Sequence, residues 1–163
     1  MRKELAQQLL RELLENSKRS DRELAKVLKV SQPTITRTRR KLEEKGLVQD
    51  YTIVPDFRKM GFEILVITFV KMHPDILVGE TRERAEKFAE KFPNVIFVSS
   101  GKGLGMTGVI ISLHKNYTEY YKQVNQLRVD LKDVTEDIQS FIIPIGEEEY
   151  KRFSLTHLKD VPL

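Results

Sequence analysis

Residues 31–41 carry side chains of the types that bind a polyanion. The segment contains Gln32, Thr36, Arg37, Arg40 and Lys41, and no acidic residue occurs between positions 23 and 43. Arginine and lysine bond phosphates or guanine edges, glutamine pairs with adenine, and threonine hydroxyls bond either. A solvated surface helix more often mixes acids with its bases, so the pattern favours contact with nucleic acid.

The charge of the whole chain is distributed unevenly. Residues 1–60 hold 15 Lys and Arg against 9 Asp and Glu, whereas residues 61–163 hold 13 against 15. This asymmetry suggests that the N-terminal third meets a polyanion and that the remainder does not. Apolar residues make up 40% of the chain and charged residues 32%, which is typical of a folded globular protein.

Three short helices are expected to position the basic segment. Leucines at helical spacing predict a first helix over 3–16, and Ser20 with Glu23 forms a capping-box start for a second helix that ends near residue 28. Ser31 is expected to cap a third helix that Gly46 ends. Two helices joined by a turn at 29–30 indicate a helix-turn-helix.

The third helix is expected to pack through one face and to offer the other to a major groove. Ile35 and Leu42, with Thr38 nearby, should face inward. Arg39 also falls on the inner face, where its guanidinium could reach a phosphate or a nearby carboxylate, and the sequence leaves both open. The candidate DNA-contacting residues are Ser31, Gln32, Thr34, Thr36, Arg37, Arg40 and Lys41.

The rest of the chain predicts a second domain. Residues 47–55 are interpreted as a short two-stranded wing and 56–62 as a hinge. Alternating apolar segments then predict strand, helix, strand, strand, helix and strand, the ferredoxin-like order. These elements are expected over 64–72, 80–92, 95–98, 107–113, 117–131 and 134–145.

We therefore predict an α+β protein with a winged helix-turn-helix over 1–55, the hinge over 56–62, a ferredoxin-like βαββαβ domain over 63–146 and a tail over 147–163. Such a sheet carries helices on one face only. A second copy of the chain is the simplest cover for the other face, so we expect a homodimer. The tail is expected to add an edge strand or to dock on a neighbour.

The chain resembles the Lrp/AsnC family of transcription regulators, also called feast/famine regulators, over nearly its whole length to about residue 145. The matching segments are 20–25, 31–37, 42–46 and 51–52, followed by Asp56 and Gly61. The resemblance implies a DNA-binding regulator that works as a homodimer, tetramer or octamer. It also implies a small-molecule effector, commonly an amino acid, bound between C-terminal domains.

The matching effector region departs from the family pattern. Members usually show Gly, two residues and then Asp in a hairpin, whereas this chain reads Gly105, Met106, Thr107, Gly108. A carboxylate that could hold an α-ammonium group is therefore absent at that position. The candidate effector-binding residues are Gly103, Gly105, Met106, Thr107 and Gly108.

Parts of the sequence also suggest other functions. The glycine-rich loop over 101–108 lacks the strand-to-helix context and the Lys-Ser/Thr ending of a phosphate-binding P-loop. An enzyme resembling sirohaem decarboxylases of the same two-domain fold is the alternative, with His114 as its candidate residue, and a helix-turn-helix that binds protein is the third possibility. No histidine of the sequence has a second ligand at metal-binding spacing; the three are His73, His114 and His157.

We expect no metal, no cofactor and no catalytic activity. The chain has no cysteine, which excludes disulfides and thiolate metal sites. Its N-terminus is too charged for a signal peptide, and its longest apolar segment is far shorter than a bilayer span. We therefore expect a soluble cytoplasmic protein whose partners are double-stranded DNA, a second copy of itself and an effector.

Overall fold

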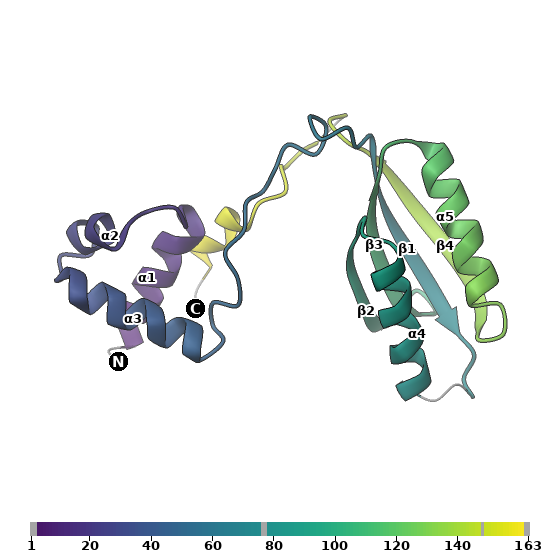
Figure 1. Ribbon diagram of the computed structural model, residues 1–163, viewed down its shortest axis with the longest axis horizontal. Helices are drawn as coiled ribbons and strands as arrows, with labels where there is room; N and C mark the ends of the chain where they lie inside the picture. The colour runs from purple at the N-terminus through teal and green to yellow at the C-terminus, as the bar shows by residue number, and fades with distance from the viewer. Residues whose placement is uncertain (1–2, 76–77, 148, 162–163) are drawn as a thin grey trace. The chain divides into compact units, whose positions relative to one another are not determined.

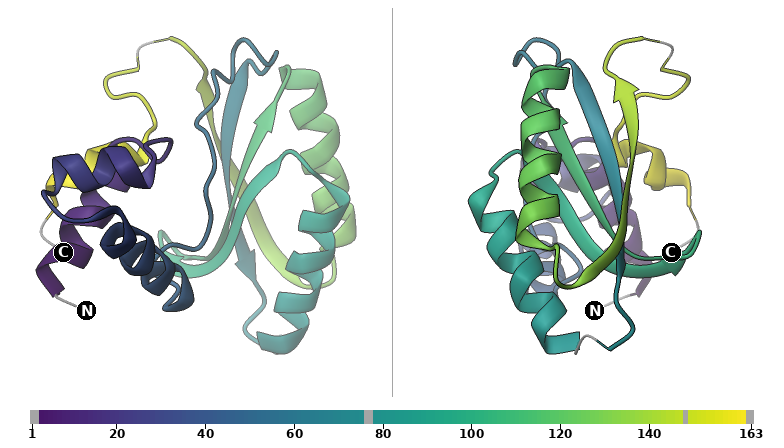
Figure 2. Two further views of the ribbon diagram at one scale, coloured as in Figure 1. Left: turned by 60° about the vertical axis from the view of Figure 1, so that its left-hand side comes forward. Right: turned by 90° about the vertical axis from the view of Figure 1, so that its right-hand side faces the viewer.

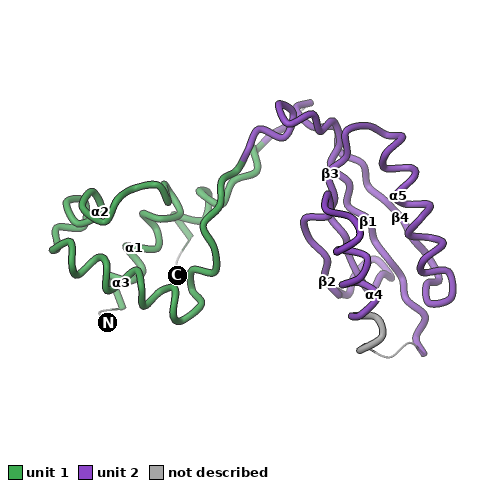
Figure 3. The backbone as a smooth tube through the Cα atoms, viewed as in Figure 1, with its two compact units in different colours: residues 1–54, 151–163 green, residues 55–150 purple. Residues whose placement is uncertain are grey.

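A computed structural model describes residues 3–75, 78–147 and 149–161, and the side chains of 78–81 are not described. The described residues form two compact units, one of 1–54 with 151–163 and one of 55–150 (Figure 3). The last segment of the chain thus belongs to the unit that contains the basic helix. Glu148, Pro162 and Leu163 of the predicted tail lie outside the described residues.

Three helices build the first unit, namely α1 (Lys3–Glu15), α2 (Asp21–Val27) and α3 (Gln32–Glu44) (Figure 1). Their apolar faces meet in a small core that includes Leu9, Leu24, Ile35 and Leu42, each at most 1% exposed. Burial of side chains at helical spacing is what holds such short helices, which are marginal in isolation. The predicted helix-turn-helix is confirmed.

The ends of α2 and α3 follow local sequence signals. Ser20 and Glu23 form the predicted capping box, in which each side chain accepts from the other residue's backbone N–H. These Ser20 hydrogen bonds are also the main reason that the pKa of Glu23 is lowered. The C-termini end in left-handed residues, Lys29 (φ 53°) and Gly46 (φ 67°), and the N–H of each following residue returns to a carbonyl inside the helix.

The two-stranded wing expected over 47–55 is wrong. In the described structure this segment contains no strand or bridge, and a bend at 47–48 is followed by irregular chain up to a turn at 57–61. The Tyr51 hydroxyl bonds side chains of α3, donating to Glu43 at 2.8 Å. Tyr51 thus contacts α3 and not a second strand.

The second unit is a four-stranded antiparallel sheet of order β2-β3-β1-β4 with two helices on one face (Figure 2). Each helix connects two strands that flank a third, so both crossovers return on the same side. The predicted ferredoxin-like order is confirmed. The elements are β1 (Ile64–Met72), α4 (Val78–Lys91), β2 (Val95–Gly103), β3 (Met106–His114), α5 (Tyr117–Asp130) and β4 (Thr135–Pro144).

The described residues of the tail form no strand. They make a 3-10 helix, η1 (Leu155–Asp160), which contacts α1 within the first unit. Lys159 Nζ lies 3.3 Å from Glu15 Oε1, although Leu155 and Leu158 remain about half exposed. The expectation of an edge strand is therefore wrong, because the tail docks on a helix of its own chain.

Candidate nucleic-acid interface

Ser31 stands at the N-cap position of α3 as expected, but its side chain makes no capping hydrogen bond. Its Oγ lies 2.8 Å from Thr34 Oγ1, and it accepts no backbone hydrogen bond. Pro33 stands in the first turn, where a missing N–H costs nothing. The backbone N–H groups of Thr34 and Ile35 donate instead to the Ser31 carbonyl, at 3.0 and 3.2 Å.

Five of the candidate side chains lie on the exposed side of α3. These are Gln32, Thr36, Arg37, Arg40 and Lys41, and the opposite side buries Ile35, Thr38 and Leu42 as predicted. Arg40 Nε lies 2.7 Å from Glu44 Oε1, an exposed pair of the kind that contributes little to stability. Arg37 Nε donates to the Pro33 carbonyl at 3.2 Å. Both guanidinium groups are thus oriented by local contacts and still reach solvent.

The two threonines of the candidate set are engaged by their own chain. Thr34 is half-buried beside Ser31, whereas the Thr36 hydroxyl donates to Asp21 Oδ2 at 2.6 Å. The backbone position of each remains on the N-terminal half of α3. Their part in binding DNA stays a prediction.

Arg39 bonds a carboxylate, which decides between the two alternatives that the sequence left open. Its Nε lies 2.8 Å from Asp21 Oδ1, and its side chain is 18% exposed. Sequence spacing placed Arg39 on the inner face correctly but could not show that Asp21, 18 residues earlier, supplies the partner.

The candidate effector residues lie at the turn that joins β2 and β3. Leu104 and Gly105 have positive φ values of 55° and 73°, which is the geometry of a tight hairpin turn. The Thr107 hydroxyl accepts from the Met72 N–H at 2.9 Å and donates to the Val70 carbonyl at 3.2 Å, while Met106 is buried. The Thr107 side chain therefore connects the hairpin to β1 through two hydrogen bonds.

The face of the sheet opposite the helices carries an apolar row. Direct cross-strand pairing places four side chains in one row across the four strands, because Ile67 pairs with Ile111 and Phe141, and Ile111 pairs with Phe97. Phe97 is 50% exposed and Phe141 is 64% exposed. An exposed apolar row of this kind marks a surface that another molecule covers.

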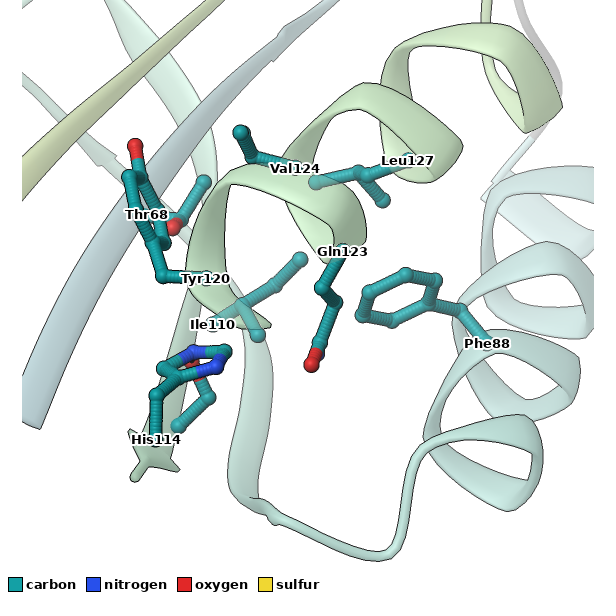
Figure 4. Close-up of a pocket in the computed structure, with 9 residues that line it drawn as sticks. Thr68, Phe88, Ile110, His114, Tyr120, Gln123, Val124 and Leu127 are labelled. Atoms are coloured by element: carbon teal, nitrogen blue, oxygen red, sulfur yellow. The ribbon is translucent and has the colours of Figure 1, made fainter. Parts of the chain in front are cut away.

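His114, the candidate residue of the enzymatic alternative, is a core residue. It is 2% exposed, its Nε2 lies 2.8 Å from Ser112 Oγ, and its Nδ1 lies 3.3 Å from Asn94 Nδ2. The cavity beside it, between α5 and the sheet, has a volume of about 10 Å³ (Figure 4). That volume holds at most one water molecule. His114 therefore has neither a free nitrogen nor room for a tetrapyrrole.

The burial of His114 predicts a pH-dependent stability. Burial lowers its pKa, and the carboxylate of Glu119 offsets part of this effect. The pKa of His114 in the folded protein is below the unfolded value of about 6.5, so the unfolded chain takes up the proton first as the pH falls. The stability that depends on neutral His114 is therefore fully present above about pH 6.5 and is lost as the pH falls toward the folded pKa.

We expect the free energy of unfolding to fall by up to about 1.4 kcal/mol per pH unit in this range, and His114→Gln to flatten the dependence. Denaturant unfolding at pH 7.5, 6.0 and 5.0 measures this. His73→Gln is the control, because that imidazole is 44% exposed. An equal slope in both variants would contradict the assignment to His114.

Among the described residues, no group of three or more His, Cys, Asp or Glu side chains is arranged to hold a metal ion. No helix in that part of the chain is long and apolar enough to cross a bilayer.

Comparisons with known proteins match this arrangement. A winged helix-turn-helix DNA-binding family matches residues 2–49. An uncharacterised HTH-type transcriptional regulator of Pyrococcus horikoshii is 28% identical over 143 residues, which cover 87% of this chain and 83% of that protein. The HTH-type transcriptional regulator LrpA of Pyrococcus abyssi is 34% identical over 79 residues, 48% of this chain and 54% of LrpA.

The fold also matches solved structures. A transcriptional regulator of Neisseria meningitidis in complex with L-Met superposes with a TM-score of 0.77 at 17% identity, over 97% of this chain and 99% of that one. Both units of the chain thus have counterparts in proteins named as transcriptional regulators.

Proposed function

Because the chain belongs to the Lrp/AsnC family of DNA-binding transcriptional regulators, we propose that it reads operator DNA with the exposed side of α3 and acts as a homodimer. The observation that carries the proposal is the row of exposed Gln32, Arg37 and Arg40 opposite the buried side of α3. Arginine and glutamine there suit base edges.

The homodimer is supported by the apolar row on the open sheet face. Two copies that meet through this face would bury Phe97 and Phe141 of each, and a self-complementary patch is what a two-fold interface requires. A dimer presents two α3 helices, which fits successive major grooves about 34 Å apart on a near-palindromic operator.

Selection from a random 30-base-pair library, followed by titration of the selected duplex at several KCl concentrations, tests the proposal. We expect tight binding that weakens steeply with salt, because phosphate contacts release counterions. A protein that enriches no sequence, or whose binding is independent of salt, would contradict DNA recognition. A protein-binding helix-turn-helix would give both of those results.

The effector is proposed for the hairpin that contains Gly103, Gly105, Met106, Thr107 and Gly108. The neisserial structure of the same fold is a complex with L-Met. Since Gly108 supplies no carboxylate, we expect free α-amino acids to bind this chain weakly.

Gly108→Asp is expected to strengthen amino-acid binding by restoring an anion for the α-ammonium group. A Cβ at this position meets only the Ser99 carbonyl oxygen at 3.5 Å, an ordinary contact, so the fold should accept the change. Calorimetric titration with L-methionine and L-leucine measures the affinity, with Gly108→Asn as the uncharged control. Equal affinity of the Asn and Asp variants would contradict a role for a carboxylate at position 108.

A further inference from the structure

One guanidinium joins three separate segments of the first unit. Arg39, on α3, lies with Nε 2.8 Å from Asp21 Oδ1 at the start of α2. Its Nη2 donates to the Arg19 carbonyl at 3.3 Å, and its Nη1 donates to the Tyr51 hydroxyl at 3.3 Å. The turn before α2 and the chain that follows α3 are thus both bonded to the same side chain of α3.

Two partners of Arg39 also form hydrogen bonds with other side chains of α3. Asp21 accepts from Thr36 Oγ1 at 2.6 Å through its second oxygen, and Tyr51 donates to Glu43 Oε1 at 2.8 Å. The Arg39 guanidinium carbon also lies 5.8 Å from the centroid of the Tyr51 ring. The Arg39 and Asp21 side chains are only 18% and 21% exposed, so the pair is shielded from water more than an ordinary surface pair.

The direction of the side chain separates Arg39 from the arginines proposed to contact DNA. The side chain of Arg40, the next residue, is 78% exposed and bonds only its own helix among the contacts of the described residues. The Arg39 guanidinium instead donates hydrogen bonds to protein oxygens in three directions. A planar guanidinium can serve such a set, whereas the single ammonium of lysine cannot reach all three.

We propose that Arg39 is a positioning residue for DNA recognition, which fixes α2 and the segment after α3 against α3 and does not itself contact DNA. The inference rests on the proposed function, since it concerns the presentation of the same helix. Without the guanidinium, the exposed side of α3 loses its fixed angle to α2, and the contacts that need exact placement weaken first. Base contacts depend on placement more than phosphate contacts do.

Arg39→Met tests this with two probes, the selected 30-base-pair duplex and a random-sequence duplex of equal length. We expect the affinity for the selected duplex to fall about tenfold or more, with little change for the random duplex and an unchanged salt slope. Arg39→Lys should recover part of the loss, because it keeps a cation near Asp21. A uniform loss on both duplexes with a reduced salt slope would show a phosphate contact and overturn the proposal.

Asp21→Asn tests the same ion pair by removing a negative charge, whereas Arg39→Met removes a positive one. If charge alone mattered, removal of an acid close to DNA would tighten binding. Positioning through the ion pair predicts weaker binding to the selected duplex, and predicts that adding Asp21→Asn to Arg39→Met causes little further loss. Tighter binding by Asp21→Asn, or fully additive losses, would overturn the inference.

A measurement without DNA keeps this inference separate from the proposed function. The pKa of the Tyr51 phenol is raised mainly by burial, and its hydrogen bond with Arg39 opposes that rise. In Arg39→Met the pKa of Tyr51 should therefore move further up, which NMR of labelled tyrosine measures. An unchanged pKa of Tyr51 would contradict its hydrogen bond with Arg39. Failure of the wild-type protein to bind DNA would contradict the proposed function instead.

Discussion

Arg37→Ala combined with Arg40→Ala is expected to lower the affinity for the selected duplex by about a hundredfold or more. A base-edge or phosphate contact is worth roughly 1 to 3 kcal/mol, and the double variant removes two such side chains from each subunit. Fluorescence anisotropy at two salt concentrations measures the loss. The melting temperature should change little, because the Arg40–Glu44 pair is exposed.

A matched control removes the same charge from another face of the first unit. Arg11 and Lys18 are both exposed outside α3, so Arg11→Ala with Lys18→Ala lowers the net charge equally. We expect the control to weaken binding only slightly. If both double variants lose the same affinity, the protein attracts DNA by overall charge, and the assignment of the α3 face fails.

Phe97→Glu combined with Phe141→Glu is expected to prevent the proposed homodimer from forming and to leave a monomer. Both rings lie on the open sheet face, and a dimer through that face would bury the new carboxylates without partners, which costs several kcal/mol per charge. Light scattering at micromolar concentration gives the mass directly. The affinity for a two-site operator should fall as well, because a monomer presents one α3.

The control places the same charges on the helix layer of the same unit. Tyr121 and Val129 on α5 are 53% and 63% exposed, so Tyr121→Glu with Val129→Glu changes exposed apolar residues equally. We expect this variant to remain a dimer. Circular dichroism confirms that each variant is folded, and a dimeric Phe97/Phe141 variant would exclude the sheet face as the interface.

The sequence predicted those features that depend on local pattern. The buried set Ile35, Thr38 and Leu42 follows from helical spacing alone, and the capping box at Ser20 follows from two residue types three positions apart. The βαββαβ order also follows from the succession of short apolar segments and helical apolar stripes along the chain. These features need no knowledge of what lies across the fold.

Features that depend on distant contacts could not be predicted. Thr36 was placed on the DNA-facing side, yet its hydroxyl bonds Asp21, which lies 15 residues earlier. A two-stranded wing was expected over 47–55, but no strand forms there and the Tyr51 hydroxyl bonds Glu43 of α3. Strand formation requires a partner, and composition does not name one.

The docking of η1 on α1 sets an order for the folding of this protein. Residues 55–150 form a contiguous unit that is complete before η1 is synthesised, whereas the first unit draws on segments from both sides of it. The three N-terminal helices can meet this packing partner only after the whole intervening unit has been synthesised. The contact between Lys159 and Glu15 is therefore among the last that translation makes available to the first unit.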